Sequence, residues 1–142
     1  MNCIKKMKIF IKKYCYASVP IITVFLLTIL YCKKIIVLPE NENYFPTLIG
    51  VSGTLIGFMF TAMTIFFSLN RNTEYMQNFK IYGHHIIFSR LVTFGIVFLS
   101  MNIICWLFNW NKYLILISFI LGLEESIMAA YYTYKLSLNS FK

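Results

Sequence analysis

Charged residues are scarce in this sequence, and their scarcity excludes most classes of soluble protein. They make up 13% of the 142 residues, whereas apolar residues make up 59%. A typical soluble domain carries about 25% charged residues, and a water-facing surface built from so few would expose large apolar patches. A lipid bilayer removes this difficulty, because a membrane-embedded helix bundle keeps an apolar exterior. The composition therefore predicts one integral membrane domain spanning residues 1–142.

The sequence also lacks the motifs of the common catalytic and metal sites. It has no phosphate-binding glycine loop, no HExxH pair and no elbow around a nucleophilic serine. Its four cysteines show no CxxC spacing, so they indicate neither a zinc site nor a redox motif. The adjacent His84 and His85 would point about 100° apart on a helix and would chelate a metal poorly. We therefore expect no enzyme activity, no cofactor and no metal site.

The net charge of +8 is better explained by membrane topology than by nucleic-acid binding, which we do not expect. Five lysines lie within residues 1–13, immediately before the first apolar run. Basic residues gather on the cytoplasmic side of a membrane, so this segment predicts a cytoplasmic N-terminus. The segment itself is either an amphipathic helix lying on the lipid surface or a basic tail that only sets topology. The run that follows has no small-x-small cleavage site, so we expect an uncleaved anchor.

Four apolar stretches are each long enough for a membrane crossing, which takes about 20 helical residues. They cover residues 14–32, 47–70, 86–108 and 113–134. With both termini in the cytoplasm, ten lysines and arginines lie inside and three outside, as the positive-inside rule requires. The sequence therefore predicts an all-α membrane bundle of four helices with the N- and C-termini inside.

The cytoplasmic loop at residues 71–85 is the longest inner connection. Apolar residues recur in it at helical spacing, so we expect the second helix to continue beyond the membrane until Gly83 terminates it. The loop is the expected contact for a cytoplasmic signal or partner protein. Its basic and titratable residues are Arg71, Lys80, His84 and His85.

One face of the second span carries almost only small and hydroxyl side chains over about five turns. Small residues allow close helix approach in lipid, where no hydrophobic effect drives helices together. Three arrangements would use this face: packing within one subunit's bundle, contact between subunits, or the lining of a polar conduit. We call it the small-residue face, and its members are Gly50, Gly53, Gly57, Thr61, Thr64 and Ser68.

Two adjacent glutamates, Glu124 and Glu125, lie inside the fourth span. Counted from its start, they lie about 17 Å along the helix, near the bilayer centre, where an acidic residue costs about 3 kcal/mol to insert. Glu125 shares a helix face with Gly122 and other small residues, and Glu124 shares one with bulkier residues, so we expect different surroundings. Arg90, near the start of the third span, is the candidate partner. The roles left open are a salt bridge with Arg90, an ion- or proton-binding site, and a carboxyl kept neutral by desolvation.

A short stretch of the second span supplies a resemblance to a known class of protein. Residues 53–58, with residues 61–62 and 68–70 and the size and topology of the chain, resemble the small multi-span membrane effectors of bacterial anti-phage (abortive infection) systems. The resemblance implies an effector that permeabilises the bacterial inner (plasma) membrane on activation. Isoleucine-, asparagine-, lysine- and phenylalanine-rich usage is also typical of an AT-rich bacterial genome.

Two functions remain open at this stage. The first is a homo-oligomeric pore, because a bundle this small buries little of its own surface. Its conduit would be lined by Glu125 together with Thr61, Thr64 and Ser68. The second is a non-conducting accessory or immunity protein that anchors or shields a partner.

Overall fold

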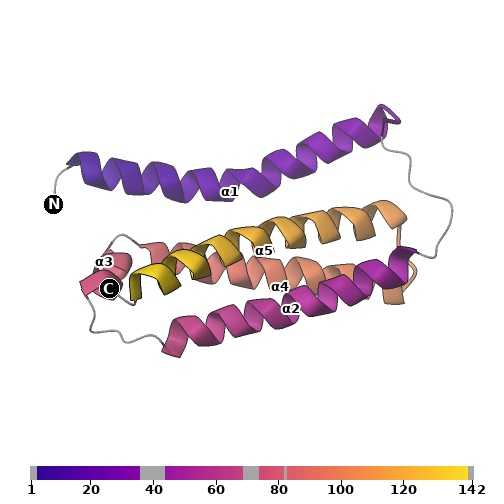
Figure 1. Ribbon diagram of the computed structural model, residues 1–142. Helices are drawn as coiled ribbons and strands as arrows, with labels where there is room; N and C mark the ends of the chain where they lie inside the picture. Colours follow the sequence, from indigo (N-terminus) through magenta and orange to yellow (C-terminus); the bar gives the residue numbers. More distant parts are fainter. Residues whose placement is uncertain (1–2, 36–43, 69–73, 82, 141–142) are drawn as a thin grey trace.

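The computed structural model describes residues 3–35, 44–68, 74–81 and 83–140, and every element in these ranges is an α-helix. Arg71 and the side chains of the basic N-terminal segment lie outside the described residues. Figure 1 shows the order and arrangement of the helices. They are α1 (Cys3–Cys32), α2 (Phe45–Ser68), α3 (Glu74–Ile81), α4 (His84–Leu107) and α5 (Lys112–Ser140).

Three of the described helices are long and apolar enough to cross a membrane: α2, α4 and the Lys112–Leu138 part of α5. They correspond to the second, third and fourth predicted spans, and α5 continues past the expected end at residue 134. In α1 the apolar stretch with described side chains, Ser18–Cys32, is shorter. The described part of the chain is therefore all-helical, as the sequence predicted, and contains three candidate membrane spans.

Helices α2, α4 and α5 form the packed body of the protein. α4 and α5 run antiparallel, and α2 packs against both of them. The antiparallel course of α4 and α5 follows from the tight turn at residues 109–112 that joins them. Asn109 takes a left-handed conformation with φ 50°, which asparagine tolerates better than most residues. Trp110 N donates to Cys105 O at 2.8 Å, and Asn111 Oδ1 accepts from Tyr113 N at 2.9 Å, so the turn satisfies both helix ends.

Helix α1 lies along α5, which is its main neighbour (Figure 1). The two are fastened near the C-terminal end of α1. There Tyr31 stacks on Tyr113 with ring centroids 4.3 Å apart, and the Tyr113 hydroxyl donates to Thr28 Oγ1 at 2.9 Å. Pro20 lies inside α1, where it removes a backbone donor, and the helix is bowed in Figure 1. α1 therefore packs on one side of α5, and α2 and α4 lie on the other side of α5.

The segment 71–85 contains a separate short helix, α3, which packs at one end of the bundle (Figure 1). Its Met76 and Phe79 are buried in the main apolar cluster. The expected continuation of the second helix would run through residues 69–73, which lie outside the described residues. Gly83 has φ 70° and precedes α4, so it ends the loop helix at the place expected for a glycine terminator.

The apolar core has two parts. The larger cluster joins α2, α3, α4 and α5 near the α3 end, and a smaller one joins α2, α4 and α5 near the α4–α5 turn. Polar residues occupy the buried positions between and beside them, on all three spans. They are Ser52, Asn102, Ser118, Glu125 and Ser126.

Two glycines allow α4 and α5 to approach closely. A Cβ on Gly122 of α5 would lie 2.5 Å from Leu99 Cγ and 3.2 Å from Leu99 N on α4. A Cβ on Gly95 of α4 would collide with the end of the Met59 side chain and lie 3.2 Å from Glu125 Cβ. The sequence marked Gly122 as a packing residue, but Gly95 was missed because it stands alone among bulky residues.

We predict that Gly122→Ala destabilises the protein by about 1–3 kcal/mol, the usual cost of overpacking a filled core. Leu99 has no exposed surface and cannot turn aside. Leu99→Ala alone should also destabilise, because it leaves a cavity, but Gly122→Ala with Leu99→Ala should cost much less than the two costs added together. Unfolding of the detergent-solubilised protein measures all three variants. Strictly additive costs would contradict the contact.

Candidate functional site

Glu125 lies at the centre of the inner face of α5. It is the middle residue of the 27-residue candidate span Lys112–Leu138, and its side chain is only 3% exposed. The three small residues expected on the same face, Ser118, Gly122 and Ala129, are buried with it. The carboxyl group is therefore enclosed at mid-depth and does not reach a helix end.

Among the described residues, one oxygen of the Glu125 carboxyl group has no hydrogen-bond partner. Gly95 on α4 lies against Glu125 Cβ, and the end of the Met59 side chain from α2 reaches the same point. Glu125 Oε2 is buried without a hydrogen bond. The neighbouring hydroxyls of Ser118 and Ser126 donate to backbone carbonyls of their own helix, at 2.8 Å to Leu114 O and 2.7 Å to Gly122 O. An ionised carboxylate is very costly in such a place unless a cation, a proton or water compensates it.

Glu124 has different surroundings, as expected from the two helix faces. It is only partly buried, and Met128 on the same face is also partly buried. Its Oε2 likewise has no hydrogen-bond partner. The two carboxyls are adjacent in sequence but point to different sides of α5, so Glu125 is the enclosed member of the pair.

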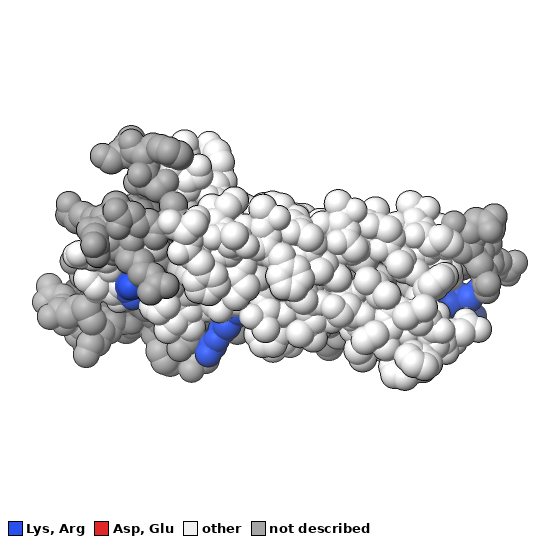
Figure 2. All heavy atoms as spheres, turned by 90° about the horizontal axis from the view of Figure 1, so that it is seen from below, with Lys and Arg blue, Asp and Glu red and all other residues white. Residues whose placement is uncertain are grey.

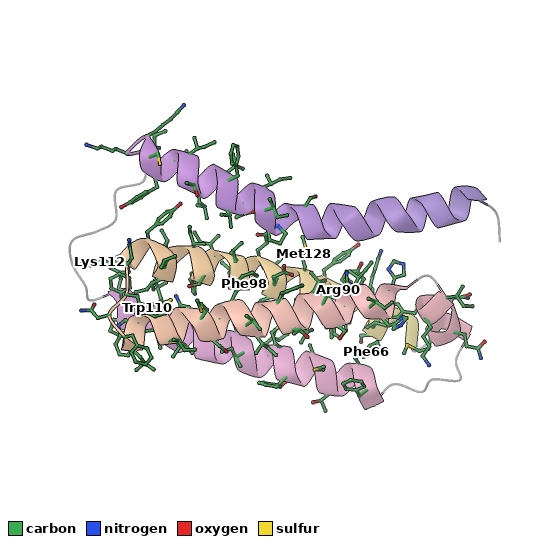
Figure 3. All side chains as sticks on the ribbon, turned by 180° about the vertical axis from the view of Figure 1, so that it is seen from behind. Phe66, Arg90, Phe98, Trp110, Lys112 and Met128 are labelled. Carbon is green, nitrogen blue, oxygen red and sulfur yellow. The ribbon has the colours of Figure 1, made fainter. Side chains whose placement is uncertain are left out.

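Arg90, labelled in Figure 3, does not meet either glutamate. Its side chain is exposed, and no ion pair joins it to Glu124 or Glu125 in the part of the chain described. The reason is angular. Arg90 precedes Gly95 by five residues, which turns it about 140° around the helix axis from the face that meets Glu125. The salt bridge, one of the three roles left open, matched Arg90 and the glutamates in their distance along the helices but not in the directions of their side chains.

The small-residue face of α2 points away from its own bundle. Among the described residues, no atom lies within 4 Å of the position a Cβ would take on Gly50, Gly53 or Gly57, and Thr61, Thr64 and Ser68 are exposed. The buried residues of α2, such as Ser52 and Met59, lie about half a turn away around the helix. In the described part of the chain, this face is therefore not used for packing within one subunit, which was one of the three arrangements left open.

The surface on the α2 side carries little charge. Figure 2 views the molecule from below, the side on which α2 lies in Figure 1, and shows a long face with a few basic residues and no acidic ones among the residues described. The hydroxyls of α2 donate to its own backbone: Thr61 Oγ1 to Gly57 O at 2.9 Å and Thr64 Oγ1 to Phe60 O at 2.9 Å. With their protons satisfied in this way, these side chains tolerate lipid, another helix or water.

Glu125 and the hydroxyls of α2 consequently do not line one passage. Glu125 points into the contact between α2, α4 and α5, whereas Thr61, Thr64 and Ser68 point outward from the opposite face of α2. The predicted conduit belongs to a homo-oligomer, and one subunit by itself does not bring the two sets of side chains together. The structure separates an enclosed carboxyl from an outward hydroxyl face.

A buried polar contact that the sequence analysis missed joins all three spans. Asn102 and Ser52 have no exposed surface. Ser52 Oγ lies 3.0 Å from Asn102 Oδ1, and Asn102 Nδ2 donates to Ile115 O at 2.7 Å, so Asn102 on α4 binds both α2 and α5. A lone asparagine inside an apolar span was the available signal, since polar residues in lipid face the bundle interior.

The loop residues do not form a site with these groups. Lys80 is exposed, and His84 lies between Phe79 and Tyr132, with ring centroids 5.5 and 6.1 Å away. His85 is partly buried at the start of α4. Among the described residues, no three histidine, cysteine or acidic side chains gather in a way that could hold a metal.

We predict that Asn102→Ala lowers the stability of the protein by about 1–3 kcal/mol, because it breaks a buried hydrogen-bonded contact and leaves its partners unsatisfied. Ser52→Ala should cost less, since Asn102 then keeps its bond to Ile115 O. Asn78→Ala is the matched control on the exposed side of α3 and should have almost no effect. Unfolding in detergent measures the three variants. Equal stability of Asn102→Ala and Asn78→Ala would contradict the assigned role.

Comparisons with protein-family models, with curated proteins and with solved structures find no match for this chain. Two features of the chain itself therefore indicate its function: the enclosed carboxyl of Glu125 at mid-depth and the free small-residue face on α2.

Proposed function

We propose that the chain is the subunit of a homo-oligomeric pore that permeabilises a bacterial inner membrane, with the small-residue faces of α2 from neighbouring copies surrounding the conduit. The observation that supports it is the direction of that face. A continuous run of glycines and hydroxyls lies on the free side of a charge-free span. In a lipid-facing monomer nothing would require such a run.

The packing of α2 within the subunit leaves it available for assembly. In its apolar window 17% of the residues are buried, compared with 39% in α4 and in α5. Small side chains bring helix backbones together in lipid, where van der Waals contact and hydrogen bonds drive association. Several copies meeting through this face would bury the surface that one copy leaves free.

A conduit between copies would be lined by hydroxyls and backbone. Thr61, Thr64 and Ser68 would present oxygen atoms to water, and their protons already bond the helix backbone. A lining without charged groups gives no strong preference for ions of one sign. This suits an effector that dissipates ion gradients better than it suits a selective channel.

The topology in this proposal has four spans and both termini in the cytoplasm. α1 is a helix of 30 residues, about 45 Å long, which is enough to cross the bilayer beside α5. The lysines within residues 1–13 would stay inside. The α3 end of the bundle is then cytoplasmic, and a signal or partner protein binding at residues 71–85 would act on Met76 and Phe79, whose side chains pack directly into the core.

The alternative, a non-conducting accessory or immunity protein, is favoured by the sealed interior of the subunit. Glu125 is enclosed by α2 and α4, and the inward side of each span carries mainly apolar residues. In this version the free face of α2 would bind a membrane helix of another protein. The resemblance to anti-phage effectors favours the pore.

We predict that Gly57→Leu abolishes assembly and liposome flux while the subunit still folds. A leucine at this position meets no atom of its own subunit but would hold neighbouring α2 helices apart. Ala130→Leu, the same kind of enlargement on the exposed side of α5, is the control and should change neither property. Native mass spectrometry and dye release from liposomes measure the pair.

Three results would distinguish the pore from the accessory role and test the α2 contact itself. Loss of both assembly and flux in Gly57→Leu alone supports the pore. Loss of assembly from a wild-type protein that never releases dye favours the accessory role. An assembly that tolerates Gly57→Leu contradicts both versions of the α2 contact.

A further inference from the structure

We propose that Glu125 is a proton-binding site: its carboxyl is held as the neutral acid between α2, α4 and α5, and loss of the proton loosens the contact at Gly95. This inference concerns the inside of one subunit and does not depend on the conduit between copies. The carboxyl of Glu125 is enclosed, and one of its oxygen atoms has no partner. A negative charge in this place would have to be neutralised by a proton or a cation, or hydrated by water.

A permanent cationic partner is not available among the described residues. Arg90 is exposed on the other side of α4, and Lys80 is exposed on α3. A bound metal ion is also disfavoured, because such ions require several oxygen ligands. No cluster of three metal-binding side chains exists in the described ranges, and the hydroxyls of Ser118 and Ser126 are directed to backbone carbonyls.

A proton is the ligand that this geometry fits. It needs one oxygen atom and no coordination sphere, and it removes the charge that makes burial costly. The balance is simple: the carboxylate takes up one proton from water, and the neutral acid gives it back when the contact opens. Glu125 Cβ lies beside Gly95, where the absence of a side chain leaves α4 and α5 in close contact.

Few titratable groups face this site. The inner face of α2 contributes none among its described residues, and neither does the described apolar part of α1. On α4, His84 and His85 lie ten or more residues before Gly95, about 15 Å along the helix. On α5 the neighbours are Glu124, on an adjacent face, and Tyr132, two turns further on.

Deprotonation would have a structural effect because the interface is filled. A charged carboxylate must recruit water, and on the Gly95 side the contact is filled, since even a methyl group there would collide with Met59 and crowd Glu125 Cβ. In this proposal, water reaches the carboxylate when α4 and α5 separate at mid-depth. Protonation therefore favours the packed state, and a rise in pH favours an open one.

Infrared spectroscopy of the full-length protein in liposomes tests the proposal, because a protonated carboxyl has its own carbonyl band. At neutral pH we expect such a band in the wild-type protein and in Glu124→Gln, and its loss in Glu125→Gln. Raising the pH should remove the band and increase hydrogen–deuterium exchange in peptides around residues 95 and 125. If Glu125→Gln fails to fold, Glu125→Asp replaces it and should shift the band.

Two results would overturn the proposal. The first is a wild-type spectrum without the protonated band at neutral pH, or with a band that Glu125→Gln leaves intact. The second is a carboxylate whose spectrum responds to added sodium or potassium ions and not to pH, since a cation would then be the ligand. If the band titrates while the exchange near residue 95 stays constant, Glu125 binds a proton but the opening at Gly95 is refuted.

Discussion

The close contact of α4 and α5 at mid-depth is the constraint on which the rest of the structure depends. Gly95 on α4 and Gly122 on α5 have no side chains, which lets the two helices approach each other at these positions. Because the backbones approach there, the inner face of α5 is covered and Glu125 on that face is enclosed. The orientation of α4 that brings Gly95 to this contact also places Arg90 on the outer side of the helix. The burial of one charge-bearing group and the exposure of another thus have a single geometric cause.

This contact also determines which face of α2 remains free. α2 packs on the α4–α5 pair through Met59 and through the polar contact of Ser52 with Asn102. Those residues fix both its rotation and its height in the bundle. The small-residue face, on the opposite side, then necessarily points to lipid or to another copy. α3 adds Met76 and Phe79 to the same core, which links this end of the bundle to α2, α4 and α5.

Much of the fold could be predicted from the sequence, because lipid imposes strict requirements. Spans of about 20 apolar residues, a tight Asn-Trp-Asn turn and a terminating Gly83 are local signals, and each has a counterpart in the structure. Helical periodicity also separated Glu125 from Glu124 correctly, since both positions lie on one helix.

The relations between helices could not be predicted in the same way. Periodicity places residues on the faces of one helix but does not say which face meets a neighbour. Arg90 lies at a depth similar to that of the glutamates but points to another side. The small-residue face of α2 could have pointed into the bundle or out of it, and the burial of Met59 on the opposite side shows that it points out. Asn102 and Gly95 are single residues without a pattern, so their roles appear only when the partner helix is in place.

Disulfide crosslinking in native membranes measures most directly whether copies of the chain meet through the outward small-residue face of α2. In a variant lacking the native cysteines, Thr61→Cys places a thiol on the small-residue face, and Ala130→Cys places one on the exposed side of α5. Copies related by an axis along the membrane normal bring equivalent residues to the same depth. We expect oxidation to give crosslinked dimers with Thr61→Cys and none with Ala130→Cys. Crosslinking through Ala130→Cys but not through Thr61→Cys would show that copies meet elsewhere and would contradict the account.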